Sequence, residues 1–310
     1  MISKDQLVKI IQEGDIQKGD ILNLKVSLKS IGKIENGPNA LIDAFLEVIG
    51  TEGTIISDAF VDAQFKTSKK DKRVIVDDES PTYAGAVASA MIKHKGSYRS
   101  QHPIQKFVAI GKMAKELTQE HTKDSFAYDV LRKMVDLHGK NIIIGPEEKV
   151  PGVGTTHVVI CEKEFEQRRI PKGVYFKNEN DKILFHQINW VGGCSFGFSN
   201  LMDIFIEKGA VLSNTDFGNT TMKVTSMKKT YEIEHEYLSK NPQYILCNDP
   251  SCISCRLSWS FSDTSYSQFF FQHLLKGKFR KALGALYYKF KGENLKGQKN
   301  IQFKNRYTNI

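Results

Sequence analysis

The chain has 310 residues, of which 40% are hydrophobic and 25% are charged, and its formal net charge is +9. This length and composition are ordinary for a globular protein with one large α/β domain or two modest ones. The longest apolar runs, such as residues 142–144 and 158–161, are far too short to span a bilayer, which excludes them as membrane helices.

Helices and short apolar strands alternate in the first part of the chain. Apolar residues recur at helical spacing in residues 5–15 and 38–49, and a proline and a glycine mark the ends of the second helix. Alternating or buried apolar residues predict strands at 21–26 and 54–56, with a loop at 27–32 between the first strand and the next helix.

The middle of the chain continues this alternation after a polar loop. Residues 62–80 are charged and predict a mobile loop. The apolar spacing then predicts helices at 83–93, 104–117 and 129–135, followed by a strand at 141–145 that ends in glycine. Strands that alternate with helices, and are apolar on both sides, are typical of a three-layer α/β architecture.

The second half of the chain predicts a hairpin and more mixed structure before the composition changes. We expect a hairpin over 174–191, helices at 201–208 and 231–238, and β-structure over 211–224. From Cys247 onward the chain is rich in cysteine and then in aromatic and basic residues. We therefore divide it into a main domain, 1–247, and a C-terminal extension, 248–310.

Two short segments carry the residue types of a binding and catalytic site. Arg99, Ser100 and His102 precede a proline that fixes a turn, so their donors could converge on a phosphate; the alternative is a surface loop with a capping serine. His157 follows a strand, a glycine-containing loop and two threonines, where backbone N–H groups could face an oxyanion and a neutral imidazole could act as a base. The alternative for His157 is a core histidine.

These two segments belong to a longer series of motifs. In chain order the series comprises residues 19–32, 36–54, Pro81-Thr82-Tyr83-Ala84-Gly85-Ala86, Arg99-Ser100-Gln101-His102-Pro103, 139–145, His157, 209–219 and Tyr244-Ile245-Leu246-Cys247. Across roughly residues 5–247 the series resembles the aminoglycoside 3-N-acetyltransferase family in order and spacing. The resemblance implies a three-layer α/β/α fold with a central mixed sheet, here followed by the C-terminal extension.

The resemblance also implies an activity and its residues. Members of the family move an acetyl group from acetyl-CoA to an amine on an amino sugar, so we expect a cytoplasmic acyltransferase with acetyl-CoA as co-substrate. His157 matches the catalytic histidine, which would take a proton as the amine attacks the thioester directly. The coenzyme contacts would come from the first loop and from the arginine segment. These residues are Ser27, Lys29, Ser30, Arg99, Ser100 and His102.

One departure from the family leaves the partner of His157 open. Where the family often has a glutamate three residues after the histidine, this chain has Ile160. We take Glu162 as the carboxylate that orients the imidazole. The alternatives are Glu164, Glu148 and Asp129. Cys161 lies close to His157 in the sequence, so a covalent thiol route is a less favoured alternative to direct transfer.

The acceptor is predicted from charge. Residues 272–310 contain ten Lys or Arg and one acid, and ten minus one is nine, so the rest of the chain is formally neutral. Aminoglycosides are polycations that favour acidic sites, whereas a neutral body with a basic tail favours an anionic acceptor. We therefore expect a nucleotide-linked amino sugar of surface polysaccharide synthesis, with an aminoglycoside as the alternative.

Cysteines and the C-terminal helix pattern suggest other roles. Cys247, Cys252 and Cys255, with the remote Cys194, could bind Zn²⁺ or iron–sulfur, but without a second CxxC pair we expect free structural thiols and no metal. Residues 269–290 form a basic amphipathic pattern that could lie on an anionic membrane. We favour docking of its apolar face on the body or on a second subunit, as in a homodimer.

The expected compartment follows from cysteine usage and from the N-terminal residues. Five cysteines, an odd number, suit a reducing compartment better than a disulfide framework, and residues 1–5 show no signal-peptide pattern. We therefore expect a cytoplasmic protein without nucleic acid as a partner. A second reading is a decayed transferase scaffold that binds a metal or a membrane through its C-terminal region.

Overall fold

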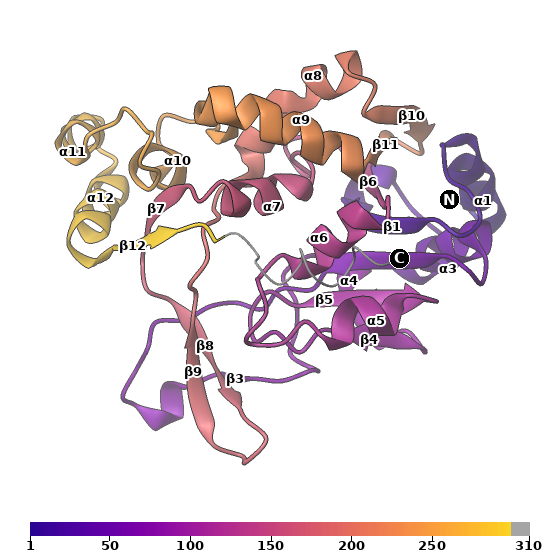
Figure 1. Cartoon of the computed structure of the whole chain (residues 1–310), viewed down its shortest axis with the longest axis horizontal. Coiled ribbons are helices and arrows are strands. Elements are labelled where there is room, and N and C mark those ends of the chain that lie inside the picture. Colours follow the sequence, from indigo (N-terminus) through magenta and orange to yellow (C-terminus); the bar gives the residue numbers. More distant parts are fainter. Residues whose placement is uncertain (299–310) are drawn as a thin grey trace.

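A seven-stranded mixed sheet forms the centre of the computed structural model, which describes residues 1–298 (Figure 1). In spatial order the strands are β10 (Val211–Phe217), β11 (Thr220–Ser226), β6 (Lys140–Ile144), β1 (Ile21–Val26), β2 (Thr54–Asp58), β5 (Phe107–Gly111) and β4 (Ser97–Arg99). The pairs β6–β1 and β1–β2 are parallel, and every other pair of neighbours in this sheet is antiparallel. The predicted central mixed sheet is confirmed.

Helices cover both faces of this sheet. Alternate strand residues point to opposite faces, so Ile55 packs into one apolar cluster and Ile56 into the other. The first cluster includes residues of α1 (Lys4–Glu13), α3 (Pro38–Ile49) and α4 (Ala86–Lys93). The second includes residues of α5 (Ala114–Gln119), α6 (Asp129–Asp136), α7 (Thr155–Glu162), α8 (Met202–Glu207) and α9 (Met227–Lys240). The three-layer α/β/α prediction is therefore confirmed.

Two smaller sheets lie outside these layers. The predicted hairpin forms as β8 (Gly173–Lys177) and β9 (Ile183–Gln187), joined by β3 (Ile75–Val76), and it extends away from the body in Figure 1. Strand β7 (Glu166–Arg169) pairs with β12 (Glu293–Lys296). The remaining short elements are α2 (Leu28–Ile31), η1 (Lys70–Lys72), η2 (Ser195–Leu201) and η3 (Pro242–Ile245).

The predicted helix at 104–117 is wrong. Residues 107–111 form β5, which pairs with β2 and β4, and the helix α5 starts only at Ala114. Phe107 to Ile110 are all buried because helices cover both faces of this strand, so apolar residues occupy successive positions and imitate a helical pattern. Gly111 then has φ +122, and a Cβ there would lie 2.2 Å from the carbonyl oxygen of Gly53.

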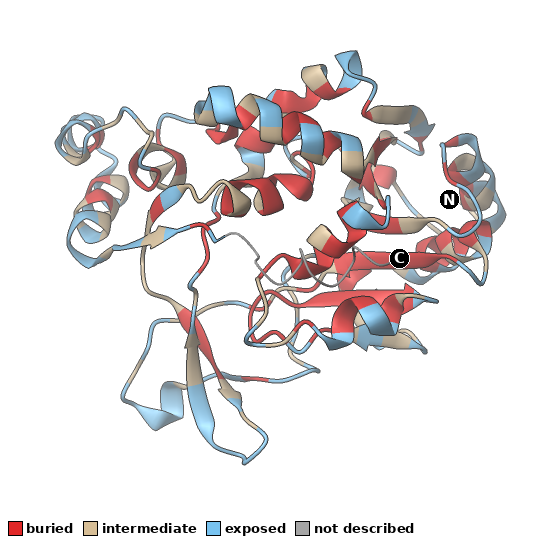
Figure 2. Cartoon of the chain, in the orientation of Figure 1, coloured by how far each residue is buried: buried red, intermediate tan, exposed pale blue. Residues whose placement is uncertain are grey.

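The C-terminal region forms the short helices α10 (Ile253–Leu257), α11 (Tyr266–Leu275) and α12 (Phe279–Lys291), with a small core of their own around Leu257, Phe269 and Ala285. The apolar pattern at 269–290 is thus two helices, separated by Gly277 at φ +67. Figure 2 shows exposed residues on the outer faces of α11 and α12, and several of these residues are large and apolar. The exposed large apolar side chains are Phe271, Leu274, Leu275, Phe279, Leu283, Tyr287 and Phe290.

The basic tail is only partly described by the structure. Three of the ten cations counted in the basic tail, Lys299, Lys304 and Arg306, lie outside the described residues. Within residues 1–298, no helix is both long enough and apolar enough to cross a bilayer.

Candidate active site

Charged residues meet where the parallel strands β6, β1 and β2 end. Carboxyl ends of parallel strands lie at the same edge of a sheet, which is where α/β proteins commonly bind ligands. Asn23 of β1 is paired with Ile56 of β2, and continuing this register by two residues places Lys25 beside Asp58. Helix α7, which carries His157 in its first turn, follows the loop after β6.

His157 is packed as a neutral imidazole. Its ring stacks on Tyr128, with centroids 4.5 Å apart and planes 7° apart, and meets the edge of Phe198 at 4.9 Å. Burial, reinforced by the positive charges of Lys25 and Arg169, lowers the pKa of His157 to about 3. Its Nδ1 is buried and has no hydrogen-bond partner in the described part of the chain. The histidine is therefore a neutral imidazole, and the described residues leave the hydrogen-bonding capacity of its Nδ1 unused.

Glu234 of α9 is a second buried group, and like His157 it interacts with Lys25. Thr156, the residue before His157, donates a hydrogen bond to Glu234 Oε1, and Oε2 is buried without a partner among residues 1–298. Burial raises the pKa of Glu234 to about 8, although hydrogen bonds from Thr156 and Thr155 and the charge of Lys25 oppose the shift. Glu234 is consequently mostly protonated at neutral pH.

Lys25 and Asp58 complete the group. Lys25 Nζ donates to the carbonyl oxygens of Pro151 and Gly152, at 3.1 and 3.3 Å, and burial lowers its pKa. Burial raises the pKa of Asp58 to about 6, partly offset by Lys25. Four neighbouring titratable groups with shifted pKa values are typical of a catalytic or binding site. We call Lys25, Asp58, His157 and Glu234 the strand-end cluster.

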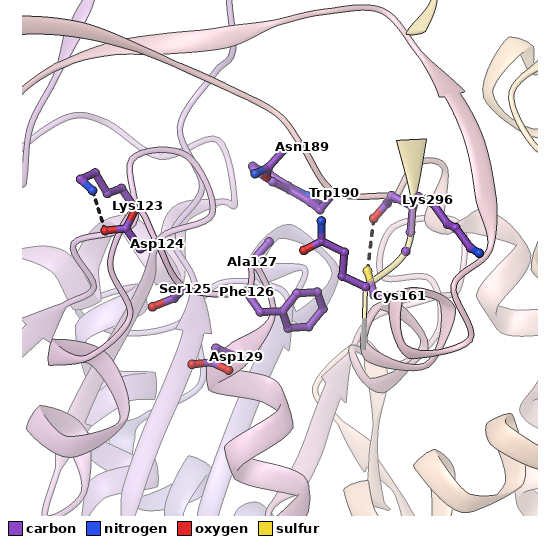
Figure 3. A pocket seen from close by; sticks show the side chains of 13 residues that line it. Lys123, Asp124, Ser125, Phe126, Ala127, Asp129, Cys161, Asn189, Trp190 and Lys296 are labelled. Carbon is purple, nitrogen blue, oxygen red and sulfur yellow. Dashed lines mark hydrogen bonds and ion pairs between the residues drawn. The ribbon is translucent and has the colours of Figure 1, made fainter. Parts of the chain in front are cut away.

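A cavity of about 360 Å³ is lined by Cys161, which lies one helical turn after His157 on α7. In Figure 3, Lys123 and Asp124 lie on one side of it, and Cys161 and Lys296 on the other. Its remaining lining residues are Ser125, Phe126, Ala127, Asp129, Asn189, Trp190, Val191, Gly297 and Gln298. The volume lies within the range of small-molecule sites.

Cys161 lines this cavity but is unsuited to nucleophilic attack. Its thiol donates to the carbonyl oxygen of Val191 at 3.6 Å, and burial raises its pKa. Because the thiolate is the nucleophilic form of cysteine, this environment disfavours the covalent alternative.

Glu162 is engaged elsewhere and does not hold His157 in this structure. Its Oε1 accepts from Arg132 at 3.0 Å, and its Oε2 accepts from Tyr231 at 2.6 Å and His235 at 3.0 Å. Burial acts to raise the pKa of Glu162, but the hydrogen bonds from His235 and Tyr231 and the charge of Arg132 outweigh it and lower the pKa. Five residues along a helix turn a side chain by about 140°, so Glu162 projects away from the face that carries His157.

The other candidate carboxylates are scattered. Asp129 begins α6 and lines the cavity, Glu148 is exposed in the loop after β6, and Glu164 follows α7 with φ +55. Sequence reasoning missed Glu234, although one signal was present. In the helix predicted at 231–238, Glu234 is an acid on the same side as Ile233 and Leu238, which are buried.

The first predicted coenzyme loop lies at the same edge of the sheet. Ser27 follows β1 directly, its Oγ lies 2.7 Å from Ser30 Oγ, and Lys29 is exposed on the short helix α2. The loop passes close to the end of β6, because a Cβ on Gly145 would lie 2.8 Å from the Cβ of Ser27. Hydroxyls and an exposed ammonium at this edge suit a phosphate ligand.

In the second predicted coenzyme segment, the polar side chains form hydrogen bonds with the protein's own backbone. Arg99 donates to the carbonyl oxygens of Ala59, Asp78 and Ser80 at 2.6 to 2.9 Å. Ser100 is 0% exposed and its Oγ accepts the Phe107 N–H, while His102 is 1% exposed and its Nδ1 accepts two backbone N–H groups. These contacts shape the loop after β4, and direct coenzyme binding by the three side chains stays a prediction.

Comparison with known proteins identifies similar sequences. A family model described as aminoglycoside 3-N-acetyltransferase matches residues 24–239. Aminoglycoside N(3)-acetyltransferase III of Salmonella sp is 26% identical over 162 residues, which is 47% of this chain and 56% of that protein. Aminoglycoside N(3)-acetyltransferase IX of Micromonospora chalcea is 25% identical over 137 residues, covering 40% and 49%. The chain thus spans about half the length of the curated relatives it matches.

Solved structures show the same fold. The structure of AAC-VIa bound to sisomicin has a TM-score of 0.66 and 19% identity, covering 77% of this chain and 97% of that one. The binary structure of AAC-IIIb with CoASH has a TM-score of 0.64 and 17% identity, covering 77% and 96%.

Proposed function

Because the chain belongs to the aminoglycoside 3-N-acetyltransferase family, we propose that it transfers an acetyl group from acetyl-CoA to an amine of an amino sugar. The observation that carries the proposal is His157, a neutral imidazole with a buried, unpartnered Nδ1 at the edge where three strands end. The names of the curated relatives and the neighbour that binds CoASH support the reaction and its co-substrate.

His157 acts as the general base of a direct transfer. As the acceptor nitrogen bonds to the thioester carbon, it gains positive charge and its proton becomes strongly acidic. His157 takes that proton as the bond forms. Because its pKa of about 3 makes it too weak a base to deprotonate a free ammonium, the acceptor has to react as the neutral amine. Coenzyme A leaves as the C–S bond breaks and takes up a proton. Neither Glu162 nor Cys161 is required for these steps.

We propose an aminoglycoside-like amine as the acceptor. The named relatives are aminoglycoside acetyltransferases, and one structural neighbour is bound to sisomicin. Asp124 and Asp129 line the cavity, but Asp124 forms an ion pair with Lys123 and Lys296 lines the cavity too, so the charge of the lining favours neither acceptor. The nucleotide-linked acceptor expected from the formally neutral body is the competing proposal.

The experiment measures thiol release from acetyl-CoA with two panels of acceptors, aminoglycosides and nucleotide-linked amino sugars. We expect release with at least one aminoglycoside at a kcat/KM of about 10⁴ M⁻¹s⁻¹ or more. Release with nucleotide sugars alone would favour the competing acceptor. Thiol release no faster than without enzyme, for every amine in both panels, would refute the transferase proposal.

Glu162→Gln should affect stability far more than catalysis. The substitution removes one of the two carboxylates paired with Arg132, the other being Asp136, in a site where the Glu162 side chain is only 14% exposed. The free energy of unfolding should therefore fall by about 1–3 kcal/mol. Denaturant unfolding and kcat, compared with the exposed control Glu148→Gln, measure the two effects. A hundredfold loss of kcat with unchanged stability would mean that Glu162 orients His157 after all.

A further inference from the structure

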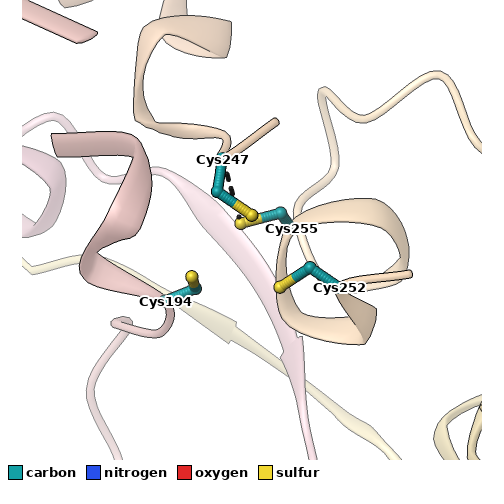
Figure 4. Close-up of side chains that lie close together, drawn as sticks. All are labelled: Cys194, Cys247, Cys252 and Cys255. Atoms are coloured by element: carbon teal, nitrogen blue, oxygen red, sulfur yellow. Dashed lines mark hydrogen bonds between the residues drawn. The ribbon is translucent and has the colours of Figure 1, made fainter. Parts of the chain in front are cut away.

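Four of the five cysteines come together in the fold, away from the strand-end cluster. Cys194 precedes η2, Cys247 follows η3, Cys252 caps α10 and Cys255 lies inside α10. Their sulfur atoms all lie within 4.8 Å of one another. Figure 4 shows the four side chains converging on one point from three separate segments.

We propose that these four cysteines bind one structural Zn²⁺ ion. Four thiolates around zinc form a tetrahedron, and a Zn–S bond of about 2.3 Å separates the sulfurs by about 3.8 Å. The observed limit of 4.8 Å is close to that spacing. A four-iron cluster holds its cysteine sulfurs farther apart, since each sulfur binds a different iron atom. Four protein ligands leave no open position, so the role is structural.

The surrounding contacts hold the sulfurs in this arrangement. The backbone N–H of Cys247 donates to Cys255 Sγ at 3.3 Å, and an N–H donor of this kind stabilises a metal-bound thiolate. The N–H of Cys194 donates to Ser254 Oγ at 3.3 Å, which ties η2 to α10. Asn200 donates to the carbonyl oxygens of Tyr244 and Leu246 at 2.9 and 3.0 Å, which ties η2 to η3.

The two segments η2 and η3 pack closely against each other. A Cβ on Gly197 would lie 2.2 Å from the carbonyl oxygen of Ile245, so only glycine lets η2 approach η3 to this distance. The sequence favoured free thiols because Cys194 lies far from the other three cysteines. The fold removes that objection by placing all four sulfurs together.

The ion would fasten the C-terminal region to the body. Cys194 and Cys247 belong to the body, and Cys252 and Cys255 begin the region that continues through α11 and α12 to β12. Strand β12 pairs with β7, and Lys296 at its end lines the same cavity as Cys161. Zinc binding therefore stabilises one wall of that cavity without touching the reacting groups.

The test is the metal content of the full chain, purified without oxygen and with a thiol reductant. We expect one zinc per chain, falling to about a tenth or less in Cys194→Ser and Cys255→Ser. The matched control is Cys161→Ser, which removes the one cysteine that is not among the four proposed zinc ligands. A serine there can still donate to Val191, so it should keep the full zinc content.

A spectroscopic measurement on the unmutated chain keeps the proposal testable if the serine variants do not fold. Exchange of the metal for Co²⁺ should give the charge-transfer and ligand-field bands of a tetrahedral four-thiolate site, and a strong chelator should lower Tm. Substoichiometric zinc with four titratable thiols, a disulfide among these cysteines under reducing purification, or bound iron would each overturn the proposal.

Discussion

His157→Asn is expected to lower kcat for acetyl transfer by about 10²–10⁴-fold, the usual contribution of a general base. Asparagine fits the space between Tyr128 and Phe198 but cannot accept the proton that the attacking amine loses. The KM for acetyl-CoA should change little, because the predicted coenzyme groups lie on the loop after β1 and the segment after β4. Steady-state kinetics with the best acceptor of the panel measures both constants.

The pH dependence gives an independent check on this role. With a pKa of about 3, His157 is already unprotonated from about pH 5 upward, so its titration should add no acid limb near 6.5 to the profile of kcat/KM. A limb near 6.5 in the wild-type protein that disappears in His157→Asn would contradict the neutral, buried histidine described above.

The control for His157→Asn is a second histidine at the opposite edge of the sheet. His138 is exposed just before β6, with φ +54, a conformation that asparagine tolerates well. His138→Asn should keep full activity. A similar loss in both variants would show that the assay reports folding rather than the loss of a base.

Much of the fold was accessible from sequence because its parallel strands are short, apolar and separated by amphipathic helices. The pattern located β1, β2, β6, α3 and the hairpin β8–β9. It failed at β5, where burial on both faces removed the alternation that distinguishes a strand from a helix. The local sequence contains no information about the pairing with β2 and β4 that decides the outcome.

The sequence could point to a site residue only where that residue belongs to a recognisable motif, and it could not show which distant residues meet in the fold. The local context of His157, a strand and a glycine loop, also allowed a core histidine. Only the resemblance of the whole motif series to the family singled it out, and its role as the base stays a prediction. Glu162 is near His157 in sequence but is bound to Arg132, whereas Glu234 is far away in sequence and accepts a hydrogen bond from Thr156, the residue before His157. The same holds for Cys194, which reaches the other three cysteines only in the folded chain.

Glu234→Gln is expected to make the protein more stable in alkaline solution than the wild type. In the folded chain the pKa of Glu234 is about 8, against an ordinary value of 4.5 that we take for the unfolded chain. Between these values the native state binds more protons than the unfolded state, so wild-type stability falls as the pH rises, by about 1.4 kcal/mol per pH unit for this group. Glutamine resembles the protonated acid and does not ionise.

The two proteins should therefore differ little near pH 4.5 and diverge up to about pH 8, where the variant should be more stable by about 3–5 kcal/mol. Asp58, whose pKa is raised from 3.8 to about 6, contributes a slope of the same sign over this narrower pH range in both proteins, and Lys25 interacts with both acids. Urea unfolding at a series of pH values measures the difference. Glu232→Gln, on the exposed side of α9, controls for the loss of one negative charge. Parallel stability curves for Glu234→Gln and the wild type would mean that Glu234 is ionised in the native protein, and the strand-end cluster would then hold two carboxylates around Lys25 rather than one.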